Sequence, residues 1–136
     1  MTSGPVLEHI IEIAAPPEHV YGLWTTPSGL ASWWAASAEV DARPGGVIRV
    51  DLGGPVMVGS YVVLDPPHHV RFTFGWETDA PDGPLPAGST TVDVTIEAIE
   101  AGSQVTLRHF GLPVAHRTNH ERGWNHFLAR MNGGST

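Results

Sequence analysis

The chain has 136 residues and a mass of 14.5 kDa, a size that fits one domain built around one core. It contains no cysteine, which excludes disulfides, thiol nucleophiles and cysteine-based zinc sites. Lysine is absent as well, which excludes enzymes that need a Schiff-base lysine or a P-loop lysine. Seven arginines against 14 acidic residues give a formal net charge of -7, so a nucleic-acid partner is not expected.

The first residues are not expected to form a secretory signal. The first residues, MTSGPVLE, have neither the basic start nor the apolar run of a secretory signal, and no stretch is long enough to cross a membrane. We therefore expect a cytoplasmic protein without membrane insertion. A single domain is predicted over residues 1–132 and a disordered tail over residues 133–136. The run 79–88, rich in proline and glycine, is predicted to be a mobile loop.

Two short helices are predicted near the N-terminus. An apolar stripe through Trp24 predicts a helix that ends at Pro27. Ser28 is expected to cap a second helix that carries Trp33 and Trp34. Because neighbours on a helix point in different directions, we expect at least one of these two rings at the surface or at a pocket rim.

The rest of the pattern predicts an α+β fold. Strict alternation over residues 6–13, and in about six further segments between residues 37 and 110, indicates antiparallel strands with one apolar face. After Pro113 the period changes and predicts a long C-terminal helix, the only large element able to cover that face. The expected architecture is a curved antiparallel sheet of about six to seven strands wrapped around the long C-terminal helix, with two short helices after the first strand. A space left between sheet and helix would form an apolar pocket.

Short motifs follow one another along nearly the whole chain: Ile11-Glu-Ile-Ala-Ala-Pro-Pro-Glu-His-Val-Tyr, Trp33-Trp34, Pro44-Gly45-Gly46, Gly59, Asp65-Pro66-Pro67, Phe72-Thr-Phe-Gly-Trp76, Val105-Thr-Leu-Arg-His109-Phe-Gly and Gly123-Trp124. This ordered set resembles the SRPBCC (START-like) superfamily and, within it, homologues of the activator of heat-shock protein 90 ATPase. The resemblance implies a helix-grip fold with a deep hydrophobic cavity between the sheet and the C-terminal helix. It leaves the activity open, because the superfamily includes lipid carriers, hormone receptors, polyketide cyclases and co-chaperone domains of the stress response.

Two histidines are the candidate polar groups of the pocket. His109 alternates with Val105 and Leu107 and should point inward, either toward a ligand or toward a neighbouring group that satisfies it. His120 shares the inner stripe of the last helix. With His116 it forms a His-x-x-x-His pair, but no third ligand is evident, so neither a metal nor a cofactor is expected. The predicted lining of the pocket is Ile11, Trp33, Trp34, Ile48, Val50, Phe72, Phe74, Trp76, Val94, Leu107, His109, His120, Trp124 and Phe127.

Three functions are compatible with this pattern. The favoured hypothesis is a module that binds a small hydrophobic molecule, with binding energy from apolar surface and orientation from the two histidines. The second is a polyketide cyclase-like enzyme in which His109 moves a proton; paired carboxylates for acid–base chemistry are missing from the pattern. The third is a co-chaperone-like interaction domain that binds another protein or forms a homodimer through exposed aromatic residues.

Overall fold

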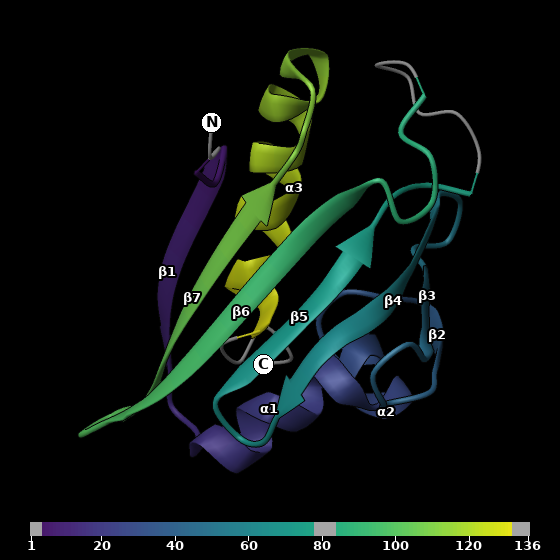
Figure 1. Cartoon of the computed structure of the whole chain (residues 1–136). Helices are drawn as coiled ribbons and strands as arrows, with labels where there is room; N and C mark the ends of the chain where they lie inside the picture. Colours follow the sequence, from purple (N-terminus) through teal and green to yellow (C-terminus); the bar gives the residue numbers. More distant parts are fainter. Residues whose placement is uncertain (1–3, 78–83, 132–136) are drawn as a thin grey trace.

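The computed structural model describes residues 4–77 and 84–131. In this part of the chain, seven strands form one antiparallel sheet in the order β1-β7-β6-β5-β4-β3-β2 (Figure 1). The predicted α+β architecture is therefore confirmed. The predicted tail, residues 133–136, and the first part of the predicted loop, residues 79–83, lie outside the described residues. The strands are β1 (Leu7–Ile13), β2 (Ser37–Val40), β3 (Val47–Asp51), β4 (Val56–Asp65), β5 (His69–Phe74), β6 (Thr90–Ile99) and β7 (Gly102–Phe110).

The predicted helices are all present. Helix α3 (Val114–Met131) lies behind β1 and β7 in Figure 1, and helices α1 (Pro17–Thr25) and α2 (Pro27–Ala31) lie at one end of the sheet. The start of α2 differs from the prediction, because Thr26 rather than Ser28 caps it: the Thr26 hydroxyl accepts a hydrogen bond from the Gly29 amide at 3.0 Å. Pro27 then occupies the first helical position, where proline needs no amide hydrogen. None of the described helices is long and apolar enough to span a membrane.

Alternation along the central strands places one face of the sheet in the core. Val70, Phe72 and Phe74 of β5 are at most 2% exposed, whereas the residues between them are half-buried. Val70 lies opposite Val94 of β6, which in turn lies opposite Leu107 of β7. Apolar side chains in register across three strands form a continuous surface, and the helices pack on this face.

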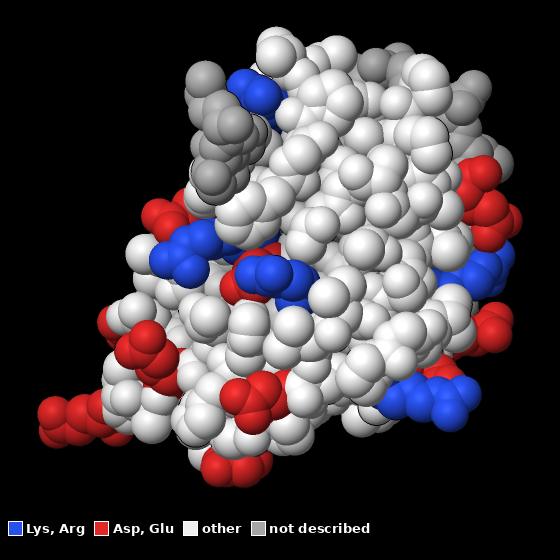
Figure 2. Space-filling view, in the orientation of Figure 1, with Lys and Arg blue, Asp and Glu red and all other residues white. Residues whose placement is uncertain are grey.

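The opposite face of the sheet carries ion pairs between neighbouring strands. The Asp93 carboxylate on β6 accepts hydrogen bonds from Arg71 Nε and His69 Nε2 on β5, both at 2.7 Å. Arg108 on β7 pairs with Glu8 on β1 at 2.8 Å. Figure 2 shows acidic and basic side chains interspersed on the side that faces the viewer in Figure 1. Pairing across strands therefore balances the charge of this face locally.

Gly59 allows β5 to approach β4 closely. A Cβ atom at this position would overlap the carbonyl oxygen of Thr73, which is backbone and has little freedom to move. We expect Gly59→Ala to lower the free energy of unfolding by about 1–3 kcal/mol through overpacking. Gly22→Ala is the matched control, because that Cβ would meet nothing within 4 Å and alanine is favoured over glycine inside a helix. Urea unfolding of both variants tests the prediction, and equal effects would contradict it.

Candidate functional site

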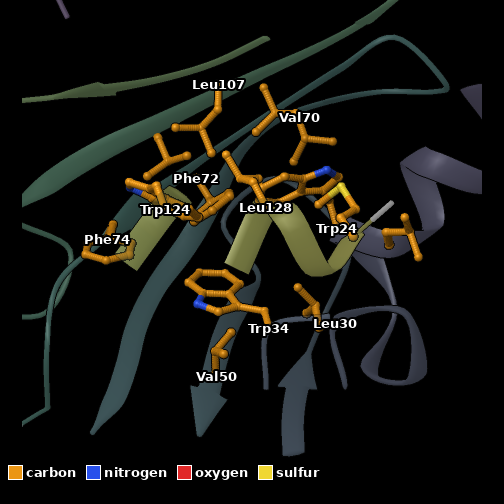
Figure 3. Packing of buried hydrophobic residues seen from close by; sticks show 14 of the residues in the cluster. Trp24, Leu30, Trp34, Val50, Val70, Phe72, Phe74, Leu107, Trp124 and Leu128 are labelled. Carbon is orange, nitrogen blue, oxygen red and sulfur yellow. The ribbon is translucent and has the colours of Figure 1, made fainter. Parts of the chain in front are cut away.

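Six aromatic rings from four parts of the chain meet on the inner face of the sheet. The ring centroids of Trp24 and Trp33 lie 4.6 Å apart, and those of Trp34 and Trp124 lie 5.3 Å apart. Edge-on and tilted contacts of this kind are favourable geometries for aromatic pairs. Figure 3 shows Trp24, Trp34, Phe72, Phe74 and Trp124 together with Leu128 of α3. This aromatic cluster consists of Trp24 from α1, Trp33 and Trp34 from the turn after α2, Phe72 and Phe74 from β5, and Trp124 from α3.

Both tryptophans after α2 are buried, so of the two expected positions, the surface or a pocket rim, the structure excludes the surface. Trp33 is 1% exposed and Trp34 is 4% exposed. Helix α2 ends at Ala31, so the two residues lie in a turn and the helical rule for neighbouring side chains does not apply. Their rings stack on each other with an interplanar angle of 20°. The indole nitrogen of Trp33 donates to the Leu23 carbonyl oxygen at 2.9 Å, which fixes the turn against α1.

His109 is held by a chain of hydrogen bonds inside the core. Trp124 Nε1 donates to His109 Nδ1 at 3.1 Å, so Nδ1 must be unprotonated. The neutral ring then carries its proton on Nε2, which lies 2.9 Å from the Thr90 hydroxyl and donates to it. That hydroxyl donates in turn to the Phe74 carbonyl oxygen at 2.8 Å. The chain links α3, β7, β6 and β5 and leaves no ring nitrogen of His109 without a partner.

The environment of His109 opposes its protonation. The residue has no solvent exposure, and its ring lies edge-on to Phe74 at a centroid distance of 4.7 Å. Burial lowers the pKa of His109 to about 3, with a smaller contribution from His120. The imidazole is therefore neutral throughout the physiological pH range.

A second tryptophan–histidine pair lies where the aromatic cluster approaches solvent. Trp76 Nε1 donates to His120 Nε2 at 3.1 Å, and His120 Nδ1 donates to the His116 carbonyl oxygen at 2.8 Å. The rings of Trp76 and His120 lie 5.3 and 5.7 Å from Phe74, and both side chains are half-buried. Both nitrogens of His120 are engaged within the protein. Within residues 4–77 and 84–131, no group of three or more histidines or acids could hold a metal ion.

The structure brings most of the predicted lining residues into one region of the core. Ile11, Trp76, His120 and Phe127 are half-buried. The remaining ten are buried, namely Trp33, Trp34, Ile48, Val50, Phe72, Phe74, Val94, Leu107, His109 and Trp124. The fourteen residues come from β1, the turn after α2, β3, β5, the isolated bridge at Trp76, β6, β7 and α3.

Trp24, Tyr61 and Thr90 belong to this region and are absent from the sequence-based set. Trp24 contacts four other rings of the aromatic cluster, and its position on the apolar stripe of α1 was the signal that could have included it. The Tyr61 hydroxyl donates to the Trp24 carbonyl oxygen at 2.8 Å, and burial raises the pKa of Tyr61, which keeps it protonated. Thr90, the partner of His109, has no signal beyond its inward position at the start of β6.

A separate, open groove of about 750 Å³ lies near the C-terminal end of α3. Its polar side chains include Glu18 and His19 from α1 and Arg130 from α3. None of the predicted lining residues contributes to it. The groove is therefore distinct from the aromatic cluster.

The comparisons with known proteins agree with this architecture. The family model described as "Activator of Hsp90 ATPase homolog 1-like protein" matches residues 14–133. No curated protein matches. An AHSA1-like protein from Rhizobium etli is 32% identical, with a TM-score of 0.70 and coverage of 93% of this chain and 78% of that chain.

Two further solved structures share the fold at lower identity. The Aha1 dimer from Colwellia psychrerythraea is 22% identical, with a TM-score of 0.76 and coverage of 93% of this chain and 92% of that chain. DynU16, a protein of the dynemicin biosynthetic locus, is 21% identical, with a TM-score of 0.74 and coverage of 93% of this chain and 45% of that chain. On the match over residues 14–133, the chain belongs to the family of activator of Hsp90 ATPase homolog 1-like proteins.

Proposed function

We propose that the protein binds a small hydrophobic molecule between the inner face of the sheet and α3. The observation that carries this proposal is the position of Trp76 and His120 over Phe74. Both side chains are half-buried and a single hydrogen bond joins them. Rotation of these two side chains would break this bond and the bond from His120 Nδ1 to the His116 carbonyl oxygen, each of which contributes about 1 kcal/mol. A ligand entering there would meet the rings of Phe74 and Trp124 directly.

Within this proposal, His109 positions the aromatic cluster and does not transfer protons. A general base works best with a pKa near the operating pH, whereas burial lowers the pKa of His109 to about 3. Its two nitrogens are already bonded to Trp124 and Thr90. These contacts favour binding over the alternative of a cyclase-like enzyme that uses His109 as its base. The cytoplasmic location expected from the sequence is part of the proposal.

Mass spectrometry and one substitution test the proposal. Native mass spectra of the freshly purified protein, followed by denaturing extraction, are expected to show a small hydrophobic companion. Trp76→Ala is expected to weaken binding of indane about tenfold, because it removes ring surface at the entrance. Ile10→Ala is the control, since Ile10 lies on β1 with 58% exposure and outside the predicted lining. Indane titrations followed by heteronuclear NMR measure both, and equal affinities in the two variants would contradict the proposed entrance.

A second candidate function is binding to another protein. The family description names activation of the Hsp90 ATPase, and an Aha1 protein of the same fold forms a dimer. If this function applies, the molar mass in light scattering should rise with protein concentration, or the chain should stimulate a chaperone ATPase. Either result without any hydrophobic companion would favour the interaction domain over the binding module.

A further inference from the structure

Trp24 places a hydrogen-bond donor, without a partner in residues 4–77 and 84–131, at the centre of the aromatic cluster. The residue has no solvent exposure, and its ring lies within 6.4 Å, centroid to centroid, of Trp33, Trp34, Phe72 and Trp124. Among the residues that the structure describes, none accepts a hydrogen bond from Trp24 Nε1. Leaving a buried N–H group unpaired is unfavourable, and such groups are rare in folded proteins.

Three other tryptophans, two buried and one half-buried, have acceptors for their indole N–H groups. Trp33 donates to the Leu23 carbonyl oxygen, Trp124 donates to His109 and Trp76 donates to His120. Trp33 is the direct neighbour of Trp24 in the cluster and equally inaccessible, yet its nitrogen has an acceptor at 2.9 Å. The unpaired nitrogen of Trp24 is therefore a local feature of this position.

We propose that Trp24 Nε1 donates a hydrogen bond to an oxygen atom of the bound ligand. The indole nitrogen is a donor only, so its partner must be an acceptor. His109 cannot serve as the hydrogen-bond donor to the ligand in place of Trp24, because both nitrogens of His109 have partners within the protein. This inference rests on the proposed function of hydrophobic ligand binding and narrows the class of ligand.

The surroundings of Trp24 indicate whether the ligand oxygen that accepts its hydrogen bond is charged or neutral. No arginine is buried among the described residues, and the buried acid, Asp93, is paired with Arg71 and His69 of β5. A carboxylate or phosphate next to Trp24 would therefore be a buried charge without a counter-ion, which is strongly unfavourable. The ligand we infer is an apolar, ring-containing molecule with a neutral acceptor such as a ketone or quinone oxygen.

A contact between the N–H group and an aromatic face is the competing explanation. Trp33 lies edge-on to Trp24 with an interplanar angle of 60°, and N–H groups interact weakly with aromatic faces. If this contact fully compensates the Trp24 N–H group, an oxygen atom on the ligand adds no binding free energy through a hydrogen bond to the indole. The two explanations predict different responses to ligands that differ only in a carbonyl group.

Two matched probe pairs separate these explanations: indane with 1-indanone, and fluorene with 9-fluorenone. Affinities are measured for the wild type, Trp24→Phe and Trp33→Phe by NMR titration. Both substitutions remove the same atoms from a buried site, but only Trp24→Phe removes an unpaired donor. Trp24→Phe is expected to weaken binding of each ketone about five- to tenfold more than binding of its hydrocarbon. Trp33→Phe is expected to change both affinities by the same factor.

The indole N–H resonances of the wild type give a second measurement that needs no stable variant of Trp24. The Trp24 resonance should move downfield with 1-indanone and much less with indane. Equal ketone-to-hydrocarbon ratios in all three proteins, or equal shifts with both probes, would overturn the role of Trp24 while leaving hydrophobic binding intact. If no probe binds the wild type, the proposed function fails and this inference fails with it.

Discussion

Trp124→Ala is expected to lower the free energy of unfolding by about 3–5 kcal/mol. Trp124 is 3% exposed and contacts the rings of Trp24, Trp34 and Phe74. Truncation removes these contacts and leaves a cavity under α3. It also removes the donor to His109 Nδ1, so a buried acceptor loses its partner. The structure therefore predicts that this one side chain holds a large share of the stability of a 136-residue protein.

Trp76→Ala is the matched control for this prediction. Trp76 also donates its N–H to a histidine at 3.1 Å, but it is half-buried and lies at the edge of the cluster. The loss expected for this variant is about 1–2 kcal/mol, because water replaces part of the lost contacts. Urea unfolding with tryptophan fluorescence and circular dichroism measures both. Equal losses of unfolding free energy in the two variants would show that burial between α3 and the sheet gives Trp124 no special role in stability.

The side of the sheet on which a residue lies was predictable from the sequence alone. Alternation with Val105 and Leu107 indicates that His109 faces inward, and the structure places all three in the core. The long helix after Pro113 was predictable from the change of period, and α3 begins at Val114. Patterns of this kind depend only on the geometry of a single element.

The hydrogen-bond partners within the site were not predictable. Thr90 and Trp124 meet His109 from β6 and α3, and neither pairing has a signature in sequence spacing. Trp33 and Trp34 are both buried because α2 ends before them, and the ends of short helices are set by local capping that the sequence pattern places only approximately. Whether a buried nitrogen has a partner depends on tertiary packing, so the contrast between Trp24 and Trp33 emerges only from the structure.

His109 should make the stability of the protein depend on pH. Its pKa is about 3 in the folded state, below the ordinary value of 6.5 that the unfolded chain is expected to have. Between these values the unfolded chain binds one proton more than the folded protein, so acid favours unfolding. The contribution of His109 to stability is thus fully present above pH 6.5, decreases as the pH falls, and levels off near pH 3. At pH 4.5 the loss amounts to about 3 kcal/mol relative to neutral pH.

His109→Gln isolates this contribution. The glutamine amide can accept from Trp124 and donate to Thr90, but it does not titrate. Unfolding free energies of both proteins are measured in urea at pH 7 and pH 4.5. Carboxylates and the other histidines affect both proteins alike, so the difference between the two pH dependences belongs to His109. The wild type should lose about 3 kcal/mol more than the variant on acidification. Parallel losses would mean that His109 is protonated as easily in the folded protein as in the unfolded chain, which contradicts its enclosure between Trp124, Thr90 and Phe74.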